Sequence, residues 1–449
     1  MRELPSGWTN ITLADAGPLV GGKTPSKSSS AYWDRGTVPW ISPKDMKSFV
    51  LVKSEDMITP HAVDDAGMEV LPVDSVLMVT RSGILEHTFP VAITTMETSI
   101  NQDIKALRPS RRILSRYAAY ALRSFGPEIL TQCSKEGTTV ASVNTEALEK
   151  FPLPLAPRDE QKRITAKLDA VLAKVDMCHT RLDRVPQILN KFREAVLEAA
   201  VSGRLTEEWR QSMTGEKWTS SSINDLCSTT FDGPFGSHLK SADYSASGIR
   251  VVRLENIGHL QFRGDLQTFI SRAKYRSLEK HTLLKDDLVF SSFVDEEVRV
   301  CLVPESLGLA INKADCFCLR IAPEKAIPQF VAYRLATPDT YRDMKAMVRG
   351  VTRPRINISH LKGYAITVPP ILEQAEIVRR VDELFAIADK LQRRYEDVFS
   401  QVEMLTPSVL AKAFRGELVP QDPNDEPTGE MLERVRAVHA GETVKRHPQ

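Results

Sequence analysis

The stretch RDEQKRITAKLDAVLAKVD at residues 158–176 decides the fold, because a related stretch, ILEQAEIVRRVDELFAIAD, returns at residues 371–389. The two stretches lie 213 positions apart, and Glu160 and Glu373 occupy the same place in each copy. The chain therefore contains an internal repeat with a step close to half its length. We expect each half to carry one globular domain followed by one copy of this segment.

Apolar residues recur in both segments with alternating steps of four and three. A period of ~3.5 residues, sustained over several heptads, lets a helix lay one narrow apolar stripe against a partner helix. We therefore predict two long helices, at 158–205 and 371–418, that form an antiparallel coiled coil and end at Gly203 and Gly416. The predicted coiled-coil positions are Leu168, Val171, Val175, Leu182, Leu189, Val381, Leu384, Leu391, Val398 and Leu405.

Two prolines interrupt these helical segments, Pro186 in the first and Pro407 in the second. A proline inside a helix removes a hydrogen bond and clashes with the preceding turn. We therefore predict a kink near each proline, at places that are not equivalent in the repeat. The alternative is that each segment forms two shorter helices within a bundle.

Length and composition point to a soluble protein of two domains. The 449 residues exceed what one hydrophobic core usually serves, and 42% hydrophobic with 26% charged residues is ordinary for a globular chain. We find no apolar run of the ~20 residues that span a bilayer and no apolar signal core at the N-terminus, so we expect a cytoplasmic protein without membrane contact. The six cysteines show no disulfide-scaffold spacing, which fits a reducing compartment.

The segments fall into an ordered series with an α+β character and a pseudo-twofold internal repeat. We predict globular domain 1 at 1–157, a helix at 158–205, a connector at 206–217, globular domain 2 at 218–370, a helix at 371–418 and a frayed polar tail at 419–449. Asn101 and Asn312 lie at matching ends of strand-like segments, 211 positions apart. In domain 1 we expect strands within 70–80 and 91–95 and a helix at 116–125.

One motif favours an enzyme. GPLVGGKT at residues 17–24 fits the phosphate-loop pattern, in which a helix beginning at the Lys-Thr pair binds phosphates through its amides. Pro25 and a Ser-rich stretch follow instead of a helical pattern, so an ATPase using Lys23 is only an alternative hypothesis. The corresponding place in domain 2 reads DGPFGSH, at 232–238, and two such loops suit a surface that contacts an extended ligand.

The remaining chemistry-bearing residues predict neither a catalytic site nor a metal site. The nine histidines are scattered, and Cys316 and Cys318 alternate as residues on one face of a strand do. Zinc would need two further ligands at a workable spacing. The net charge of +1 does not by itself predict a nucleic-acid binder, so DNA binding would need local clusters of cations or basic partners.

At the level of motifs the chain resembles the specificity subunits of type I restriction-modification systems over essentially its whole length. The resemblance is carried by PLAPRDEQKRITAKLDAVLAKVD at 154–176, PQILNKFREAVLEAAVSGRLTEEWR at 186–210, PPILEQAEIVRRVDELFAIADKLQ at 369–392 and LAKAFRGELV at 410–419. The loops GGKTPS at 21–26 and DGPFGSHLK at 232–240 are similar to loops of the family's target-recognition domains. The resemblance implies two tandem mixed α/β target-recognition domains joined by spacer helices.

The resemblance also implies a function and partners. We expect a non-catalytic subunit that binds double-stranded DNA, reads a bipartite asymmetric site, and assembles with two modification subunits and two restriction subunits. S-adenosylmethionine, ATP and Mg would act in those partners, which methylate adenine or translocate and cleave DNA. The modification subunits could also supply part of the phosphate neutralisation, which fits the near-neutral charge.

Base reading should fall to polar loop residues that present paired hydrogen-bonding groups, while Lys and Ser bind phosphates. The candidates are Lys23, Thr24, Tyr32, Trp33, Arg81, Ser82 and Lys135 in domain 1, and Ser237, His238, Lys240, Arg253, Asn256, Arg349, Arg353 and Arg355 in domain 2. Each has a structural alternative: Trp33 could be a core residue, Arg253 and Asn256 could cap a strand end, and Arg353 could pair with an acid.

Two further hypotheses concern the helices. They could act as a ruler for the gap between the half-sites, so that an insertion between Ser202 and Trp218 would change that gap. Alternatively, the chain is a coiled-coil scaffold whose globular ends bind proteins rather than DNA. A gel-shift assay with and without the methyltransferase partner separates the scaffold from the DNA reader.

Overall fold

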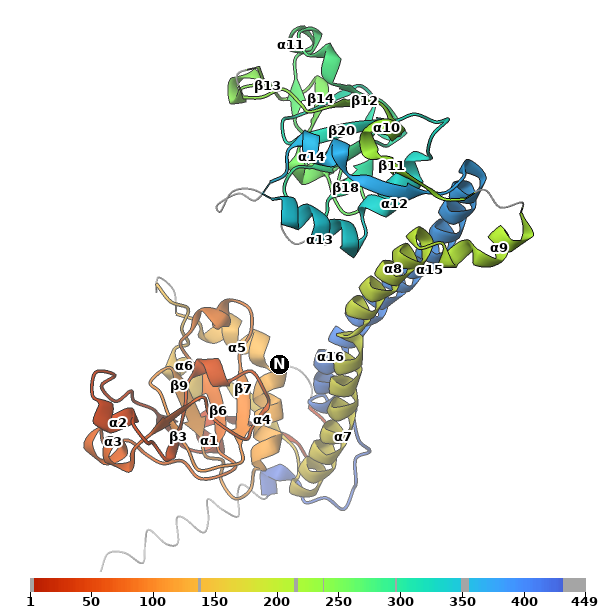
Figure 1. The fold of residues 1–449 in the computed structure, drawn as a ribbon. Helices are drawn as coiled ribbons and strands as arrows, with labels where there is room; N and C mark the ends of the chain where they lie inside the picture. The colour runs from red at the N-terminus through yellow and green to blue at the C-terminus, as the bar shows by residue number, and fades with distance from the viewer. Residues whose placement is uncertain are drawn as a thin grey trace, which may run out of the picture. The chain divides into compact units, whose positions relative to one another are not determined.

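The computed structural model describes residues 4–135, 139–213, 217–236, 238–294, 297–348 and 355–430. The chain divides into two compact units, the first made of Met1–Arg181 and Val398–Gln449 and the second of Leu182–Asp397. Each unit contains one globular domain and a pair of helical segments (Figure 1). The fold is therefore α+β with an internal repeat.

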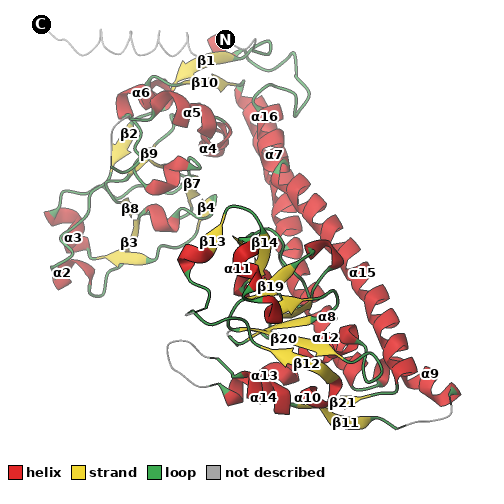
Figure 2. Ribbon diagram, turned by 90° about the horizontal axis from the view of Figure 1, so that it is seen from above, coloured by secondary structure: helices red, strands yellow, loops and turns green. Residues whose placement is uncertain are grey.

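Domain 1 is built on a five-stranded sheet with a second, smaller sheet beside it (Figure 2). The larger sheet has the order β2 (Leu19–Gly21), β9 (Ile104–Leu107), β6 (Val76–Val79), β7 (Val91–Thr94) and β4 (Val50–Leu51), and the smaller one β5 (Asp56–Ile58), β3 (Val38–Ile41) and β8 (Ser99–Ile100). A ribbon of β1 (Thr9–Thr12) and β10 (Pro152–Leu155) completes the strands. The helices are α1 (Leu13–Ala16), α2 (Ser30–Trp33), α3 (Pro60–Asp65), α4 (Ser115–Ser124), α5 (Gly126–Cys133) and α6 (Thr145–Glu149). The predicted strands and the helix at 116–125 are confirmed as β6, β7 and α4.

Domain 2 repeats this plan. Its sheet order β12 (Cys227–Phe231), β20 (Cys316–Ile321), β17 (Leu288–Ser291) and β18 (Val300–Leu302) matches β2, β9, β6 and β7 of domain 1. The second sheet has the order β13 (Tyr244–Ser245), β15 (Phe269–Ile270), β14 (Ile249–Val252), β19 (Ala310–Asn312) and β16 (Thr282–Leu283), and β11 (Thr219–Ser222) pairs with β21 (Ala365–Val368). The helices are α10 (Ile223–Leu226), α11 (Arg272–Arg276), α12 (Pro328–Leu335), α13 (Pro338–Met347) and α14 (Ile358–Gly363).

Both long helical segments are broken near their prolines, as predicted. The first consists of α7 (Arg158–Leu182) and α8 (Val185–Val201), with Pro186 in the first turn of α8, where a missing N–H costs least. The second consists of α15 (Ile371–Glu403) and α16 (Leu405–Ala413). Gly203 and Gly416 follow with φ of +76° and +74°, the left-handed conformation that glycine adopts without strain.

The helices run antiparallel within each unit. In the second unit Arg193 of α8 bonds Asp389 at 2.9 Å, and the later Leu205 accepts a 2.7 Å hydrogen bond from the earlier Arg380. In the first unit His179, near the end of α7, lies 3.4 Å from Glu403 at the end of α15. Figures 1 and 2 both show α8 alongside α15 and α7 alongside α16. This confirms the antiparallel pairing.

The predicted coiled-coil positions are only partly correct. Leu168, Val175, Leu189 and Val381 are buried, and Val171, Leu182 and Leu384 are half-buried. Leu391, Val398 and Leu405 are instead 50%, 37% and 42% exposed, so the prediction that they lie in the seam is wrong. A straight helix drifts by about 20° per heptad from a strict seven-residue repeat. The end of α15 at Glu403 interrupts the stripe further.

Each domain is fixed to its own helix by repeated contacts. The side-chain carbonyl of Gln161 accepts a hydrogen bond from the amide of Leu114 at 3.0 Å, and Gln374 accepts one from Ile327 at 2.7 Å. The amide groups of the two glutamines donate to the backbone carbonyls of residues 156 and 369. Both glutamines are fully buried. These contacts anchor each domain on the first turn of α7 or α15.

The segment after α16 corrects the prediction of a frayed tail. Gln421 donates to Glu160 at 3.0 Å, Asp425 pairs with Arg163 at 2.5 Å, and the Thr428 hydroxyl donates to the carbonyl of Leu155 at 3.1 Å. Residues 421–428 therefore pack on the base of domain 1. Residues 431–449 of the predicted tail lie outside the described residues.

Candidate nucleic-acid interface

Each glycine-rich loop packs against the turn that contains the repeated asparagine of its own domain, Asn101 or Asn312. A Cβ atom added to Gly22 would lie 2.0 Å from the carbonyl oxygen of Ile100, and one added to Gly233 would lie 2.1 Å from the carbonyl carbon of Lys313. Only glycine permits this approach of two backbones. Gly22 and Gly233 are 211 positions apart, the step that separates Asn101 and Asn312. The loops and turns therefore form one repeated structure.

The turn after each asparagine differs by one residue between the domains. In domain 1 the amide of Asp103 donates to the side-chain oxygen of Asn101 at 3.1 Å. Domain 2 has an additional residue, Ala314, and the amide of Asp315 donates instead to the carboxylate of Asp232 at 3.0 Å. The buried side-chain oxygen of Asn312 is left without a partner as a result.

A third segment joins this cluster in both domains. The amide of Thr80 donates to the carbonyl of Asp103 at 2.8 Å, and Ser292 donates to Asp315 at 2.9 Å. The next residue along, Arg81 or Phe293, forms a β-bridge with Ser142 or Arg355 respectively. Each domain thus gathers the glycine-rich loop, the asparagine turn and a strand end at one corner.

Domain 1 brings several predicted residues to this corner. Lys23 donates to the carbonyls of Ala66 and Gly67 at 2.9 and 3.0 Å, and Thr24 donates to the side-chain oxygen of Gln102. Arg81 is exposed, and Ser82 caps the short helix Gly83–Glu86. Lys135 is also exposed, and its amide bonds the carbonyl of Ser142 beside Arg81.

Tyr32 and Trp33 lie on α2 and are both half-buried. The Tyr32 hydroxyl bonds Asp65, which raises its pKa, and the Trp33 indole donates to the carbonyl of Ser26 at 3.0 Å. Trp33 also packs edge-on against Trp40 with ring centres 5.2 Å apart. Trp33 is therefore part of a small apolar cluster, and a role in DNA contact stays a prediction for both residues.

The loop at 17–24 does not have the phosphate-loop conformation. Strand β2 lies between Gly17 and Gly22 rather than before the motif, and the next helix in the described chain is α2, which begins at Ser30 rather than at Lys23. The Lys23 ammonium is bonded to backbone carbonyls of the α3 end. This geometry offers no helix N-terminus for a triphosphate.

Domain 2 gathers cations around Tyr244. The guanidinium of Arg253 lies 5.9 Å from the Tyr244 ring, and the Lys313 ammonium lies 5.1 Å from it and donates to its hydroxyl at 2.5 Å. Arg355 lies over the Phe293 ring and 3.4 Å from Asp315. His238 and Lys240, at the end of the glycine-rich loop, are exposed.

Asn256 corrects a prediction, and three candidates lie outside the described residues. The Asn256 side chain is only 1% exposed; its oxygen accepts from the amide of Arg253, and its amide group donates to the carbonyls of Arg263 and Leu266. It caps a strand end and cannot contact a base. The candidates outside the described residues are Ser237, Arg349 and Arg353.

The sequence reading missed Gln102, Tyr244 and Lys313. Gln102 and Lys313 each follow the repeated asparagine, and this common position was the signal that could have identified them. No sequence feature marks Tyr244 in the same way, because its position beside Arg253 and Lys313 depends on the folding of β13.

The carboxylate of Asp232 has an unusual environment. Burial raises its pKa to about 6, and the negative charge of Asp315 adds to this increase. The hydrogen bonds that the carboxylate accepts from the backbone amides of Gly233 and Asp315 oppose it. His281 also faces this corner: its Nδ1 lies 2.9 Å from the Asp232 carbonyl oxygen, and burial lowers its pKa. Domain 1 has Gly21 at the position of Asp232.

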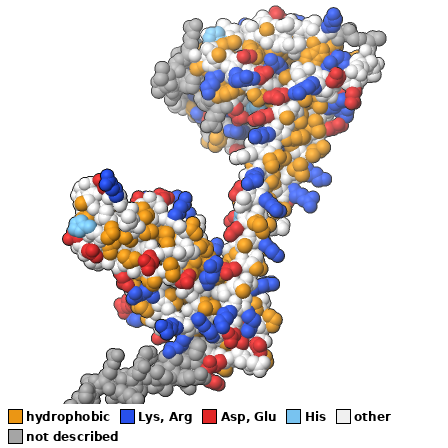
Figure 3. Space-filling view, turned by 60° about the horizontal axis from the view of Figure 1, so that its bottom comes forward, with side chains coloured by type: hydrophobic (Ala, Val, Ile, Leu, Met, Phe, Trp, Pro, Cys, Tyr) orange, Lys and Arg blue, Asp and Glu red, His pale blue; other side chains and the backbone are white. Residues whose placement is uncertain are grey.

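The described part of the chain shows no metal site, and the one face seen in Figure 3 shows no continuous basic surface. The described residues contain no group of three His, Cys, Asp or Glu side chains placed to bind a metal ion. Cys316 and Cys318 are buried in β20, as predicted for strand residues. On the face shown in Figure 3 the described Lys and Arg side chains lie among acidic and apolar ones.

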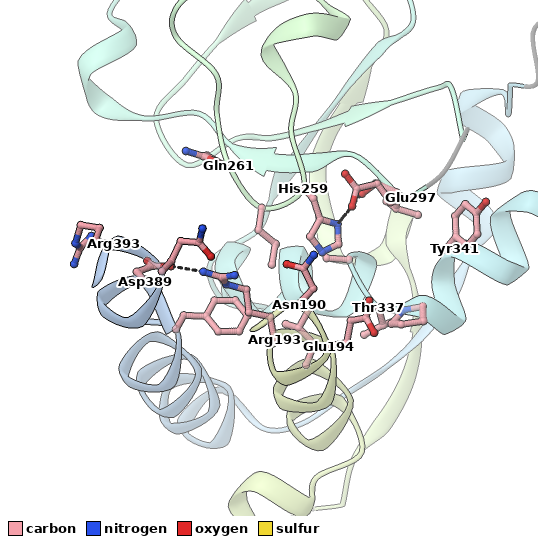
Figure 4. A pocket seen from close by; sticks show the side chains of 17 residues that line it. Asn190, Arg193, Glu194, His259, Gln261, Glu297, Thr337, Tyr341, Asp389 and Arg393 are labelled. Carbon is pink, nitrogen blue, oxygen red and sulfur yellow. Dashed lines mark hydrogen bonds and ion pairs between the residues drawn. The ribbon is translucent and has the colours of Figure 1, made fainter. Parts of the chain in front are cut away.

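Each unit also has a hollow between its domain and its helices. The hollow in unit 2 has a volume of about 840 Å³ and is lined by mixed charges, including the pairs Arg193–Asp389 and His259–Glu297 (Figure 4). The hollow in unit 1 has a volume of about 1050 Å³. Four helix-borne lining positions are equivalent at a step of 213: Asn190, Arg193, Glu194 and Leu197 correspond to Glu403, Thr406, Pro407 and Leu410.

Comparison with known proteins gives a consistent family. Residues 5–187 and 300–397 match the family described as Type I restriction modification DNA specificity domain. The chain is 28% identical over 465 residues to the type I restriction enzyme EcoKI specificity subunit of Escherichia coli strain K12, covering 99% of this chain and 98% of that protein. It is 33% identical over 330 residues to the EcoBI specificity subunit of Escherichia coli, covering 69% of each.

Solved structures share the fold. A chain from a study of complex assembly and conformational transition in a type I R-M system superposes with a TM-score of 0.66 at 17% identity, covering 93% of this chain and 100% of that one. The HsdS subunit of Thermoanaerobacter tengcongensis gives a TM-score of 0.57 at 17% identity, covering 93% and 98%. Within the described residues, the helices are too short or too polar to cross a membrane.

Proposed function

Because the chain belongs to the family of type I restriction-modification DNA specificity subunits, we propose that each of its globular domains reads one half of a bipartite, asymmetric DNA site. The observation that supports this most directly is the loop cluster that recurs in both domains with different side chains. Lys23 in domain 1, for example, corresponds to Pro234 in domain 2. Two versions of one recognition fold with different polar groups are suited to two different half-sequences.

The catalytic steps belong to partner subunits in this proposal. Modification subunits would bring S-adenosylmethionine for adenine methylation, and restriction subunits would bring ATP and Mg for translocation and cleavage. The two hollows support the binding of two copies of the modification subunit, because four helix-borne lining positions of one hollow are repeated in the other. Each hollow has a domain wall and a helix wall, so a partner filling it would contact both.

The test uses the full chain expressed with its modification partner, followed by mapping of methylated adenines in host DNA. Gly22→Ala forces a Cβ against the carbonyl of Ile100, and Gly233→Ala does the same at Lys313. We expect the first change to weaken base preference only in one half-site and the second only in the other. Gly83→Ala and Gly264→Ala are matched controls, because nothing lies within 4 Å of either added Cβ.

Two results would overturn the proposal. A wild-type complex without a bipartite methylation pattern would contradict the DNA-reading function and favour the protein-binding scaffold. Normal half-site preferences in both glycine variants would show that these loop clusters do not read the bases.

We also propose that the paired helices set the gap between the half-sites. The insertion that should change this gap belongs in the helices, however, and not in the connector as the sequence suggested. The connector between Ser202 and Trp218 contains α9 (Glu207–Ser212) and is folded onto α15, since Arg210 bonds Glu373 at 2.8 Å. An insertion there would loop out. A heptad inserted after Asn190, with a matching heptad after Gln392, would instead lengthen both helices by ~10.5 Å, or roughly three base pairs.

The expected result of the paired insertion is a methylation site with both half-sequences unchanged and the gap increased by about three base pairs. The control is a heptad inserted after Ser212, which should leave the gap unchanged. The ruler proposal fails if the paired insertion leaves the gap as it was, or if the connector insertion changes it equally.

A further inference from the structure

We infer that the residue after the repeated asparagine reads a base in each half-site, with Gln102 contacting an adenine and Lys313 a guanine. This inference rests on the proposed DNA-reading function and adds the residue and the base class. Neither residue was among the sequence candidates. Both occupy the tip of the turn that each glycine-rich loop packs against.

The backbone under both side chains is held from several directions. Asn101 and Asn312 are 5% and 0% exposed and anchor the turn, and the amide of Lys313 donates to the carbonyl of Val252 at 2.9 Å. The glycine-rich loop covers the other side, because Gly22 and Gly233 touch the turn backbone. A side chain that reads bases must be presented from a rigid support, since a misplacement of ~1 Å loses the paired geometry.

The side chains themselves are accessible and already oriented. Gln102 is exposed and its side-chain oxygen accepts from Thr24, while Lys313 is half-buried against the Tyr244 ring. The Tyr244 ring attracts the ammonium, and one ammonium hydrogen bonds the Tyr244 hydroxyl, so the lysine is restricted while two of its donors stay available. Arg253 shares the same ring and adds positive charge at this corner.

The functional groups differ in a way that selects different bases. A glutamine amide carries both a donor and an acceptor, and so matches N6 and N7 of adenine in the major groove. A lysine ammonium carries only donors, and so matches O6 and N7 of guanine. One structural position therefore presents different hydrogen-bonding groups in the two halves, which would make the site asymmetric at that position.

The experiment maps methylated adenines produced by the complete complex carrying Lys313→Gln, Gln102→Lys or neither change. We expect Lys313→Gln to shift one position of a single half-site from G·C toward A·T by about tenfold or more in methylation rate. Gln102→Lys should produce the reverse shift at one position of the other half-site. Lys325→Gln is the matched control, because Lys325 is exposed and bonds the carbonyl of Asp225 away from the turn.

The outcomes separate this inference from the function on which it rests. A bipartite site in the wild type, with unchanged base preference in both variants, would overturn the inference and leave the function standing. So would a uniform loss of binding for all sequences with a weaker salt dependence, since that is the signature of a phosphate contact. Absence of a bipartite site in the wild type would instead remove the function itself.

Discussion

Each domain buries a glutamate at the same position of the repeat, but the two glutamates have different hydrogen-bond partners. Glu373, at the base of domain 2, accepts hydrogen bonds from Trp218 and Thr206 at 2.8 Å each and pairs with Arg210. Glu160, at the base of domain 1, accepts from Trp8 at 2.9 Å and from Gln421 at 3.0 Å, both neutral donors. Both glutamates are 1% exposed.

The difference follows from what the chain supplies at each base. The connector after α8 continues into domain 2 and brings Arg210 to the carboxylate, whereas the segment after α16 brings Gln421. Arg163 approaches from the next turn of α7, but it is bonded to Asp425. A buried carboxylate in the first turn of a helix can therefore be satisfied with or without an ion pair, because the helix N-terminus also favours the negative charge.

The largest effect is expected for Arg210→Ala. The change leaves the buried Glu373 carboxylate with only the neutral donors Trp218 and Thr206, and removing one partner of a buried ion pair costs about 3 kcal/mol or more. Hydrogen exchange followed by mass spectrometry should show faster exchange in the peptides of β11 and early α15 while those of β1 and early α7 stay unchanged. Equal protection in variant and wild type would mean that the ion pair contributes nothing to the base of domain 2.

Smaller effects are expected for Trp8→Phe and Trp218→Phe, one in each domain. Each change removes the indole donor of a buried carboxylate, and a hydrogen bond to a charged group contributes about 1.5–3 kcal/mol. We expect Trp8→Phe to cost more, because Glu160 retains only Gln421 as a side-chain donor. Urea unfolding of each variant, read through the same local peptides, checks the order, and a greater loss in Trp218→Phe would contradict the comparison.

A loss of about 1–2 kcal/mol is expected for Gln421→Ala, again confined to the base of domain 1. The reason is the lost amide donor to Glu160. Gln392→Ala provides a control, since that glutamine bonds Glu396 on the exposed side of α15. Local hydrogen exchange at residues 9–12 measures the effect, and a response equal to that of the control would argue that the contact is unimportant.

The smallest expected effect is a change in pH dependence. Burial raises the pKa of Glu160, while the Trp8 hydrogen bond and Arg163 oppose the shift and Asp425 adds to it. A raised pKa means that the folded domain holds the proton more tightly, so this contribution to stability is complete below the unfolded pKa and is lost as pH rises. Thermal unfolding of Glu160→Gln should therefore approach or exceed the wild type increasingly from pH 4.5 to pH 8. A constant difference would refute this.

The helices and the repeat could be predicted from the sequence because they depend on local periodicity. The steps of 213 and 211 located Gln161, Gln374 and both asparagines at structurally equivalent places. The exposure of Leu391, Val398 and Leu405 could not be predicted, because a heptad pattern does not show where a straight helix drifts away from its partner. The docking of residues 421–428 depends on contacts with residues far away in sequence, which composition does not reveal.

The candidate site was predicted less completely. The glycine-rich loops were recognised as surface elements because glycine and proline punctuate the sequence. Asn256 was wrongly included among the base contacts, because the sequence does not distinguish an asparagine that caps a strand from one that is free to bind a base. The corner around Tyr244 required the structure, since β13 and the turn after β19 are about 70 positions apart in the chain and meet only on folding.

The docked end of the chain limits how the gene can be shortened. Thr428 is fully buried and its backbone amide bonds the carbonyl of Gly7 at 2.9 Å, so a stop codon before it would open the base of domain 1 to proteases. A stop codon after residue 430 would keep every described contact. Affinity tags are therefore best placed beyond that point, where they leave the contacts around Glu160 intact.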